Sequence, residues 1–291
     1  MIRRKADAAL ALNAVIWGAT FTLVKAALRD ISPLLFITLR FSLAALALGA
    51  LWLLGWRGRK AEPQAVLAGI LIGFLLFAGF LLQTLGLQFT TPPKSAFLTG
   101  LTSVMVPLLA SLVYRNKPQA SEVLGVVVAT TGLALLTLEG PIGSIGKGDL
   151  LTILCAVAFA GHIVTLGHYS GKASYEMLSI IQVATAAVLG ISLFWWVEPL
   201  RIVWNPAVIY AILVTGLLAT ALAFSIQAWA QKYTSSTRTA LIYMLEPVIA
   251  WLVSYWVLGV GLAGRAAAGA VLILAGVALV ELKPMQIRLH P

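Results

Sequence analysis

The sequence predicts an all-α integral membrane protein with ten transmembrane helices, arranged as two inverted repeats of five helices each. Three observations lead to this fold class: the composition, the length of the apolar runs and an internal repeat. Hydrophobic residues make up 60% of the 291 residues and charged residues only 10%, and the mean hydropathy is +0.97. Soluble domains carry about 25% charged residues, so this composition excludes a water-soluble domain.

Ten apolar runs follow one another between Gly, Pro and charged residues, and each is about as long as a helix that crosses the ~30 Å hydrocarbon core of a bilayer. Lipid cannot hydrogen-bond a backbone, so each run is predicted to be a helix. The first run is longer than the core of a signal peptide, so we interpret it as a membrane helix. In chain order, the predicted helices span 8–28, 34–55, 65–89, 95–114, 121–138, 150–170, 177–197, 207–232, 237–258 and 263–281.

The basic residues of the short connections indicate the orientation. With a cytoplasmic N-terminus, one side carries thirteen Lys and Arg: Arg3, Arg4, Lys5, Arg57, Arg59, Lys60, Arg115, Lys117, Lys172, Lys232, Arg238, Lys283 and Arg288. The other side carries five: Arg29, Lys94, Lys147, Arg201 and Arg265. The positive-inside rule therefore predicts a multi-pass plasma membrane protein, in a bacterium an inner membrane protein, with both termini in the cytoplasm. That placement requires an even number of spans.

An internal repeat becomes visible when the chain is shifted against itself by 144 residues. The shift aligns Gln83 with Gln227, Phe89 with Tyr233, Thr90 with Thr234, Ala96 with Ala240, Gly125 with Gly269 and Gly132 with Gly276. The sequence thus divides into a first repeat at 1–140 and a second at 141–291. Because five is odd, the second repeat must enter the membrane from the opposite side, which is the plan of many secondary transporters.

Several short segments resemble a known family. They are Trp-Gly-Ala-Thr-Phe at 17–21, Ala-Phe-Leu-Thr-Gly-Leu at 96–101 with Pro107 beyond it, Leu-Glu-Pro at 245–247, and the pair Gly269 and Gly276. In order and spacing, these segments resemble the drug/metabolite transporter superfamily, and within it the EamA-type ten-helix exporters. The resemblance covers nearly the whole chain. It implies a 5+5 inverted-repeat carrier of metabolites or xenobiotics, with a central cavity formed mostly by the first, third, fourth, sixth, eighth and ninth helices.

Seven residues are candidates for the substrate cavity: Trp17, Phe21, Gln83, Thr99, His162, Gln227 and Tyr243. The amides and Thr99 either join helices or orient a polar ligand. The aromatic rings either pack in the bilayer or stack on amphipathic cargo. His162 either relays protons or, the reading we favour, donates a hydrogen bond between helices.

Four further residues are candidates for a hinge or for coupling: Arg40, Pro107, Glu246 and Pro247. A proline inside a helix removes a hydrogen bond and bends the helix, so Pro107 and Pro247 predict interruptions in corresponding helices. Glu246 is the only carboxylate near the middle of a predicted span. Its burial in charged form costs about 2.5–3.5 kcal/mol, and a structural acceptor role is favoured over proton coupling. For Arg40, snorkelling to the outer interface is favoured over an inward contact with an anion.

The predicted function is secondary active export of small organic metabolites or xenobiotics, with amino-acid-like or amphipathic and aromatic cargo, by alternating access and with proton coupling as an option. An integral membrane enzyme acting on a lipid-linked substrate is the alternative, but such chemistry needs clustered acidic residues, His or Cys that the sequence does not place together. We expect no catalytic residues, no cofactor and no metal. The basic residues do not form one face, so the expected partners are the substrate and the bilayer, without nucleic acid. The expected assembly is a monomer or a weak homodimer.

Overall fold

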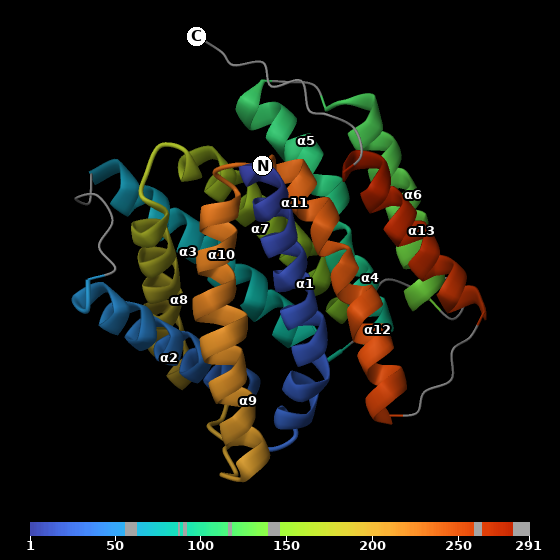
Figure 1. Ribbon diagram of the computed structural model, residues 1–291. Coiled ribbons are helices and arrows are strands. Elements are labelled where there is room, and N and C mark those ends of the chain that lie inside the picture. Colours follow the sequence, from blue (N-terminus) through green and yellow to red (C-terminus); the bar gives the residue numbers. More distant parts are fainter. Residues whose placement is uncertain are drawn as a thin grey trace.

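The computed structural model describes residues 1–55, 63–86, 88–89, 92–115, 118–138, 146–258 and 264–281, and within these ranges all regular secondary structure is helical (Figure 1). The first half contains α1 Ile2–Ala27, α2 Pro33–Leu53, α3 Pro63–Gly86, α4 Pro92–Gly100, α5 Thr102–Tyr114 and α6 Ala120–Thr137. The second half contains α7 Lys147–Ser170, α8 Tyr175–Val197, α9 Pro206–Gly216, the π-helical turn η1 Leu217–Leu222, α10 Ala223–Ala230, α11 Ser236–Tyr243, α12 Leu245–Leu258 and α13 Gly264–Glu281.

Local signals explain several of the helix ends. Pro33 and Pro206 occupy the first turns of α2 and α9, where no N–H is needed. The Asn205 side chain accepts a hydrogen bond from the Val208 N–H at 2.9 Å, and Ser235 caps α11 by accepting from the Arg238 N–H at 3.2 Å. These caps place the helix starts within a few residues of the predicted positions.

Eight helices are long and apolar enough to cross a membrane, within the described part of the chain. They are Ile2–Ala27, Pro33–Leu53, Pro63–Gly86, Phe97–Tyr114, Ala120–Thr137, Lys147–Ser170, Tyr175–Trp196 and Pro206–Ala230. The runs predicted at 237–258 and 263–281 are also helical, but the first is interrupted at Met244 and the second contributes a shorter apolar helix, Gly264–Val280. Within the described residues, eight of the ten predicted spans are thus shown, and the other two stay predictions.

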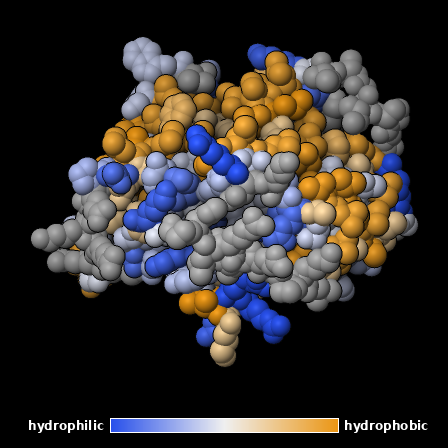
Figure 2. All heavy atoms as spheres, turned by 90° about the horizontal axis from the view of Figure 1, so that it is seen from above, coloured by the Kyte–Doolittle hydropathy of each residue, from blue (hydrophilic) through white to orange (hydrophobic). Residues whose placement is uncertain are grey.

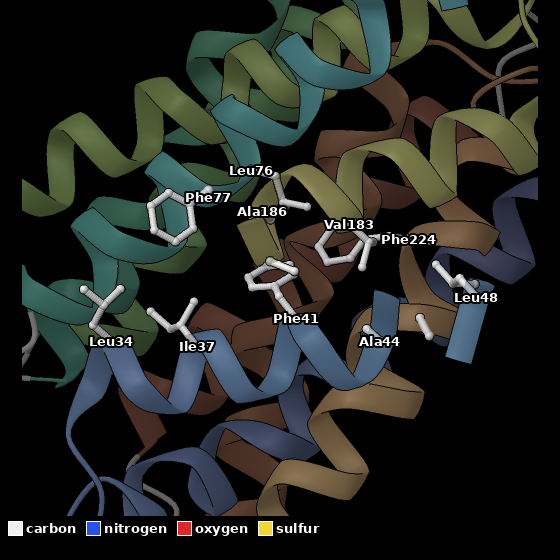
Figure 3. Close-up of a cluster of buried hydrophobic side chains, with 12 residues drawn as sticks. Leu34, Ile37, Phe41, Ala44, Leu48, Leu76, Phe77, Val183, Ala186 and Phe224 are labelled. Atoms are coloured by element: carbon white, nitrogen blue, oxygen red, sulfur yellow. The ribbon is translucent and has the colours of Figure 1, made fainter. Parts of the chain in front are cut away.

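Two helix pairs stand at opposite sides of the bundle: α2 with α8, and α6 with α13 (Figure 1). Along the first pair, one face of α2 buries Leu34, Phe41 and Leu48 against α3, α8 and α10 (Figure 3). A similar cluster joins α6 and α13 through Leu133 and Ile273. Burial of these side chains supplies a large part of the packing that fixes the helices around the centre.

Glycines allow α6 and α13 to cross closely. A Cβ atom at Gly132 would lie 2.6 Å from the Gly269 carbonyl oxygen, and one at Gly276 would lie 2.6 Å from the Gly125 carbonyl oxygen. Since both obstacles are backbone atoms, a larger residue has no room there. The two backbones are thus locked at two points along one crossing.

The helices between these pairs pack in matched combinations. α3 packs on α7 and α8, while the helix formed by α9, η1 and α10 packs on α1 and α2. Likewise α1 packs on α12, while α7 packs on α4 and α5. Exchanging the first half for the second reproduces these pairings, whereas the packing of α11 on α5 is found on one side of the exchange only.

Two helices are interrupted at corresponding places. Leu101 separates α4 from α5, and Met244 separates α11 from α12. Pro247 explains the second interruption, because it cannot donate to Tyr243, the last residue of α11. The first interruption lies six residues before Pro107, at a point where Thr102 and Ser103 hydroxyls donate to the Thr99 and Gly100 carbonyls at 2.7 and 2.8 Å. The interruption therefore lies before Pro107 and not at Pro107, where we predicted it.

The start of α1 and the end of α13 lie at the same end of the bundle (Figure 1). There Arg238 of α11 forms an ion pair with Asp7 of α1 at 3.3 Å and donates to the Val280 carbonyl of α13 at 2.9 Å. Arg238 is 2% exposed and is therefore buried. The count of basic residues that gave the orientation had instead treated it as part of an exposed connection. Figure 2 shows the molecule from this end. Hydrophobic side chains cover much of the periphery, and hydrophilic side chains lie among them.

Candidate functional site

A cavity of about 240 Å³ lies at the centre of the bundle. Its walls come from α1, α2, α3, α4, α5, α7, α10, α11 and α12, with one residue from α6. Val24 and Leu28 at the end of α1 and Phe36 at the start of α2 line it, so it extends toward the end of the bundle opposite the N-terminus. Toward the N-terminal end, Leu10 and Ile242 pack in a buried cluster near the Asp7–Arg238 ion pair.

Aromatic rings from both halves form one wall of the cavity. Trp17 of α1 lies edge-on to Tyr243 of α11, with ring centroids 4.8 Å apart, and 5.4 Å from Phe224 of α10. Phe80 of α3 lies 5.4 Å from Phe159 of α7. These ring contacts, two of them edge-to-face and one tilted, fix the rings in place and give the cavity an apolar surface.

Arg40 of α2 reaches into the cavity wall. Its Nε donates to Thr220 Oγ1 at 2.6 Å, and one terminal nitrogen donates to the Ala219 carbonyl at 3.0 Å. The guanidinium carbon also lies 4.6 Å from the centroid of the Phe80 ring. Because Arg40 is only 6% exposed, the favoured snorkelling interpretation is wrong, and the inward alternative describes its position.

The π turn η1 provides both of these partners. The Ala219 carbonyl accepts from the Trp17 indole N–H at 2.8 Å as well as from Arg40. π turns are rare and occur often at functional sites. Two side chains of the first half are therefore positioned by one irregular turn of the second half, which the apolar run at 207–232 gave no reason to expect.

Glu246 of α12 lies on the cavity wall together with Arg40 and Tyr243. The backbone at this point is held close to α1, because a Cβ atom at Gly18 would lie 2.7 Å from the Glu246 carbonyl oxygen. The glycine next to Trp17 thus allows α12 to bring the carboxyl group to the cavity.

Amide and imidazole groups complete the wall. Gln83 Nε2 donates to Thr99 Oγ1 at 3.4 Å, and Gln227 Nε2 donates to Gln231 Oε1 at 3.2 Å. The Oε1 atom of Gln227 is buried and has no hydrogen-bond partner among the described residues. His162 Nε2 of α7 lies 2.9 Å from Gln182 Oε1 of α8. This contact is an interhelical hydrogen bond of the kind that we favoured for His162 from the sequence.

The structure brings nine of the eleven predicted site residues together on the cavity wall: Trp17, Arg40, Gln83, Thr99, His162, Gln227, Tyr243, Glu246 and Pro247. The side chain of Phe21 lies outside the described residues. Pro107 is buried in α5 and does not line the cavity. Their roles in binding, bending or coupling stay predictions.

Sequence reasoning missed Phe80, Phe159 and Phe224 on the wall and Thr220 behind Arg40. The three phenylalanines are indistinguishable in sequence from lipid-facing ones. Only the predicted place of their helices, the third, sixth and eighth, could have selected them.

Comparison with known proteins identifies the family of this chain. The profile of the EamA-like transporter family matches residues 4–138 and, separately, residues 146–282. The chain belongs to this family. This EamA-like chain is a multi-pass membrane protein of a transporter family, as the resemblance of its sequence predicted.

Relatives of this EamA-like protein span almost the whole chain. An "Uncharacterized transporter" of Archaeoglobus fulgidus is 35% identical over 281 residues, which cover 97% of this chain and 87% of the relative. The "Uncharacterized inner membrane transporter YedA" of Escherichia coli K12 is 25% identical over 258 residues, covering 86% of this chain and 80% of the relative. A protein of known crystal structure has the same fold, with a TM-score of 0.82 at 19% identity, covering 96% of this chain and 98% of that one.

Proposed function

We propose that this protein is a secondary active transporter that exports small organic metabolites or xenobiotics, with amino-acid-like or amphipathic and aromatic cargo, by alternating access. Ten transmembrane helices form two inverted repeats, at 1–140 and 141–291. The protein sits in the plasma membrane with both termini in the cytoplasm, as a monomer or weak homodimer. The observation that carries the proposal is a central cavity whose charged and aromatic walls come from both halves.

The crossing of α6 and α13 supports the inverted repeat. Gly125 and Gly132 correspond to Gly269 and Gly276 at the 144-residue offset, but the close contacts join Gly132 to Gly269 and Gly125 to Gly276. Exchanged contacts of this kind are the property of an interface on a two-fold axis. The two separate matches of the family profile, the matched helix contacts and the matched interruptions point the same way.

The arrangement of the cavity supports alternating access. It extends toward the end opposite the N-terminus, while Asp7 of the first half and Arg238 of the second half meet at the N-terminal end. In the second state, this ion pair is broken and contacts form at the opposite end. The cavity then opens toward the N-terminal end. Two halves of similar structure and opposite orientation give these two states similar energies.

Proton coupling in this proposal runs through Glu246, the carboxyl group on the cavity wall. Arg40 lies on the same cavity wall and has the opposite charge, so the net charge of the two groups depends on whether Glu246 carries a proton. A proton or a substrate cation that binds there changes the balance, which links cargo to the proton gradient.

Proteoliposomes test the transport proposal. Vesicles are loaded with a defined mixture of amino acids, amines, organic acids, sugars and nucleobases, and the released compounds are identified by mass spectrometry. We expect saturable, protein-dependent release of a limited set, accelerated by the same compounds on the other side. A Thr99→Trp variant fills the cavity and abolishes release, whereas Leu154→Trp, at a 45% exposed position on α7, leaves it intact. Turnover of a lipid substrate without such release contradicts the proposal and favours the enzyme.

Reporter fusions test the topology. Reporters that are active only in the cytoplasm, fused before Met1 or after α13, both give activity if the two ends share the cytoplasmic side. A pair of fusions that report different compartments contradicts an even number of spans.

A further inference from the structure

Some helices meet at the N-terminal end of the bundle whose repeat counterparts do not meet at the opposite end. At the N-terminal end, α5 packs on α11, and α7 packs on α10 and α11 (Figure 1). The counterparts of these contacts would join α12 to α4, and α1 to α3 and α4. Those combinations are not among the helix pairs that pack together in the described part of the chain. Because two inverted repeats otherwise make corresponding contacts at both ends, the unmatched contacts mark the end at which the cavity is closed.

Side chains from three elements converge on one turn of α7 at this end. A Cβ atom at Gly167 would overlap the Ser236 hydroxyl, and it would lie 3.1 Å from the Tyr114 hydroxyl and 3.2 Å from Gln231 Nε2. Tyr114 is the last residue of α5, Gln231 directly follows α10, and Ser236 is the first residue of α11. The glycine therefore leaves the space in which these three side chains meet.

Hydrogen bonds hold the three side chains to the backbone of α7. The Tyr114 hydroxyl donates to the Val164 carbonyl at 2.9 Å and lies 3.3 Å from Ser236 Oγ. The Ile163 carbonyl accepts from Gln231 Nε2 at 2.9 Å and from Ser236 Oγ at 3.4 Å. All of these groups are neutral, so they can separate without leaving a buried charge unpaired.

These hydrogen bonds adjoin the wall of the cavity. Ile163 and Gln227 line the cavity, and Gln227 Nε2 donates to Gln231 Oε1 at 3.2 Å. Polar groups therefore continue from the cavity wall to the contact between α5 and α11. The buried Gln227 Oε1, which has no hydrogen-bond partner among the described residues, leaves an acceptor along this line.

Resting on the proposed function, we propose that Tyr114, Gln231 and Ser236 form a gate, the N-terminal gate, through which cargo reaches the cavity from the N-terminal end. The gate is closed in this structure. It opens when α5 and α7 separate from α11 and the end of α10, which breaks the hydrogen bonds to the Ile163 and Val164 carbonyls.

The hydrogen bonds of the N-terminal gate have no equivalent in the sequence of the other repeat. At the 144-residue offset, the three gate residues correspond to Leu258, Leu87 and Pro92, which are all apolar. Two inverted repeats alone give the two states similar energies. Hydrogen bonds at one end only favour the state in which that end is closed, so the protein without cargo is open toward the opposite end.

A disulfide across the N-terminal gate tests whether the gate must open. Cys155 is the only cysteine of the sequence, and Cys155→Ser removes it. In this background, Gly167→Cys and Ser236→Cys place two thiols in contact, because a Cβ atom at 167 already reaches the 236 side chain. Oxidation is expected to reduce release from proteoliposomes to the rate of empty vesicles, and a reducing agent is expected to restore it.

Ile31→Cys with Ile202→Cys provides a matched disulfide away from the gate. These two residues face each other in an antiparallel bridge between the loop before α2 and the loop after α8, flanked by main-chain hydrogen bonds of 2.7 and 2.8 Å. Opposed residues in such a bridge are about 4.5–5.5 Å apart between Cα atoms, which suits a disulfide. Oxidation of this pair is expected to leave release intact. Equal loss of release in both oxidised pairs contradicts the assignment of the gate.

Labelling from one side tests the N-terminal gate without any measurement of transport. Ser103→Cys, also in the Cys155→Ser background, places a thiol on the cavity wall. A membrane-impermeant maleimide is added to vesicles that expose either the N-terminal end or the opposite end, and labelling is expected mainly from the opposite end. Tyr114→Phe removes the hydroxyl bonds of the gate. It is expected to raise the labelling rate from the N-terminal end about tenfold, the shift that such hydrogen bonds give a two-state equilibrium.

Tyr169→Phe is the matched control for the labelling. Tyr169 lies on α7 at the same end, outside the gate, with its ring edge-on to His168 and near Lys172. Wild-type labelling rates are expected from both sides. A purely structural role for Tyr114 would instead lower the folded yield of Tyr114→Phe and leave the side of labelling unchanged, which overturns the gate.

Failure of the gate and failure of the carrier give different results. Release that continues in the oxidised Gly167→Cys and Ser236→Cys protein overturns the gate and leaves the carrier standing. Equal labelling rates in Tyr114→Phe and Tyr169→Phe also overturn the gate. Absence of release of every compound by the wild-type protein overturns the transport proposal, whereas the labelling rates still decide whether this end opens.

Discussion

At the 144-residue offset, the glycines of α6 correspond to glycines of α13, and Gln83 corresponds to Gln227, whereas Arg40 corresponds to Ala184 and Glu246 to Thr102. The glycines of the α6–α13 crossing are thus present in both halves of the chain. Each charged group of the cavity is present in only one half. α3 is likewise a regular helix of 24 residues, while its counterpart contains the π turn that holds Arg40.

This difference separates scaffold from chemistry. Two halves that exchange conformations need similar packing, because the two states must be close in free energy. The side chains of the cavity wall have no such requirement in the proposed mechanism, since a single cavity serves both halves. Because Arg40 belongs to the first half and Glu246 to the second, the proposed transport cycle would change the distance between the two charges in the cavity.

The largest expected effect comes from the shared glycines. Gly132→Val places side-chain atoms against the Gly269 carbonyl and the Ile273 N–H. Both groups belong to the backbone of α13, which cannot move aside. Overpacking costs about 1–3 kcal/mol even where side chains can move, so we expect loss of most folded protein. Size-exclusion chromatography and thermal unfolding in detergent measure this. Gly276→Val is expected to be equally damaging if the two halves share this crossing.

Gly49→Val is the matched control for the crossing. Gly49 lies on α2, and a Cβ atom there meets nothing within 4 Å. Wild-type yield is expected. A Gly132→Val protein as stable as Gly49→Val would break the claim that the scaffold depends on this contact.

The second prediction concerns Glu246, whose counterpart in the first half at the 144-residue offset is Thr102. Glu246→Gln keeps the shape but cannot release a proton, so flux is expected to lose its dependence on a pH gradient while folded yield stays near wild type. Proteoliposomes with and without an imposed gradient measure this. Preserved dependence together with a reduced folded yield would instead assign Glu246 a structural role.

The sequence was enough to predict where most helices lie and nine of the residues that line the cavity. Run length, prolines and caps set the helix ends, and the offset of 144 pointed to Gln83 and Gln227, which both line the cavity. The π turn could not be predicted, because the segment from Leu217 to Leu222 has the same apolar composition as the α-helical residues around it. For the same reason snorkelling was favoured over the inward direction of Arg40, since its partners belong to that turn. Nor did a local pattern indicate that Arg238 is buried with Asp7, because their contact depends on packing between residues far apart in the chain.

The third prediction uses the amide pair that both halves share. Gln83→Leu and Gln227→Leu each remove a polar group from the cavity wall. A neutral hydrogen bond contributes about 0.5–1.5 kcal/mol, so each change is expected to raise the KM for the transported compound by up to about tenfold, and by similar factors. Counterflow kinetics measure both values. A large effect in one half alone would mean that the shared amides have also diverged in function.

The smallest effect is expected from the hydroxyl groups of Thr99 and Tyr243, which correspond at the same offset and both line the cavity. Thr99 Oγ1 accepts from Gln83 at 3.4 Å, and the Tyr243 hydroxyl lies 3.5 Å from Asn13 Nδ2, so both bonds are long and weak. Tyr243→Phe also keeps the ring against Trp17. Thr99→Val and Tyr243→Phe are therefore expected to change KM by less than about threefold, since each removes under about 0.6 kcal/mol. A tenfold loss in Tyr243→Phe but not in Thr99→Val, measured by the same kinetics, would show that the Tyr243 hydroxyl contacts the substrate, and would add a third polar group to those that distinguish the two halves.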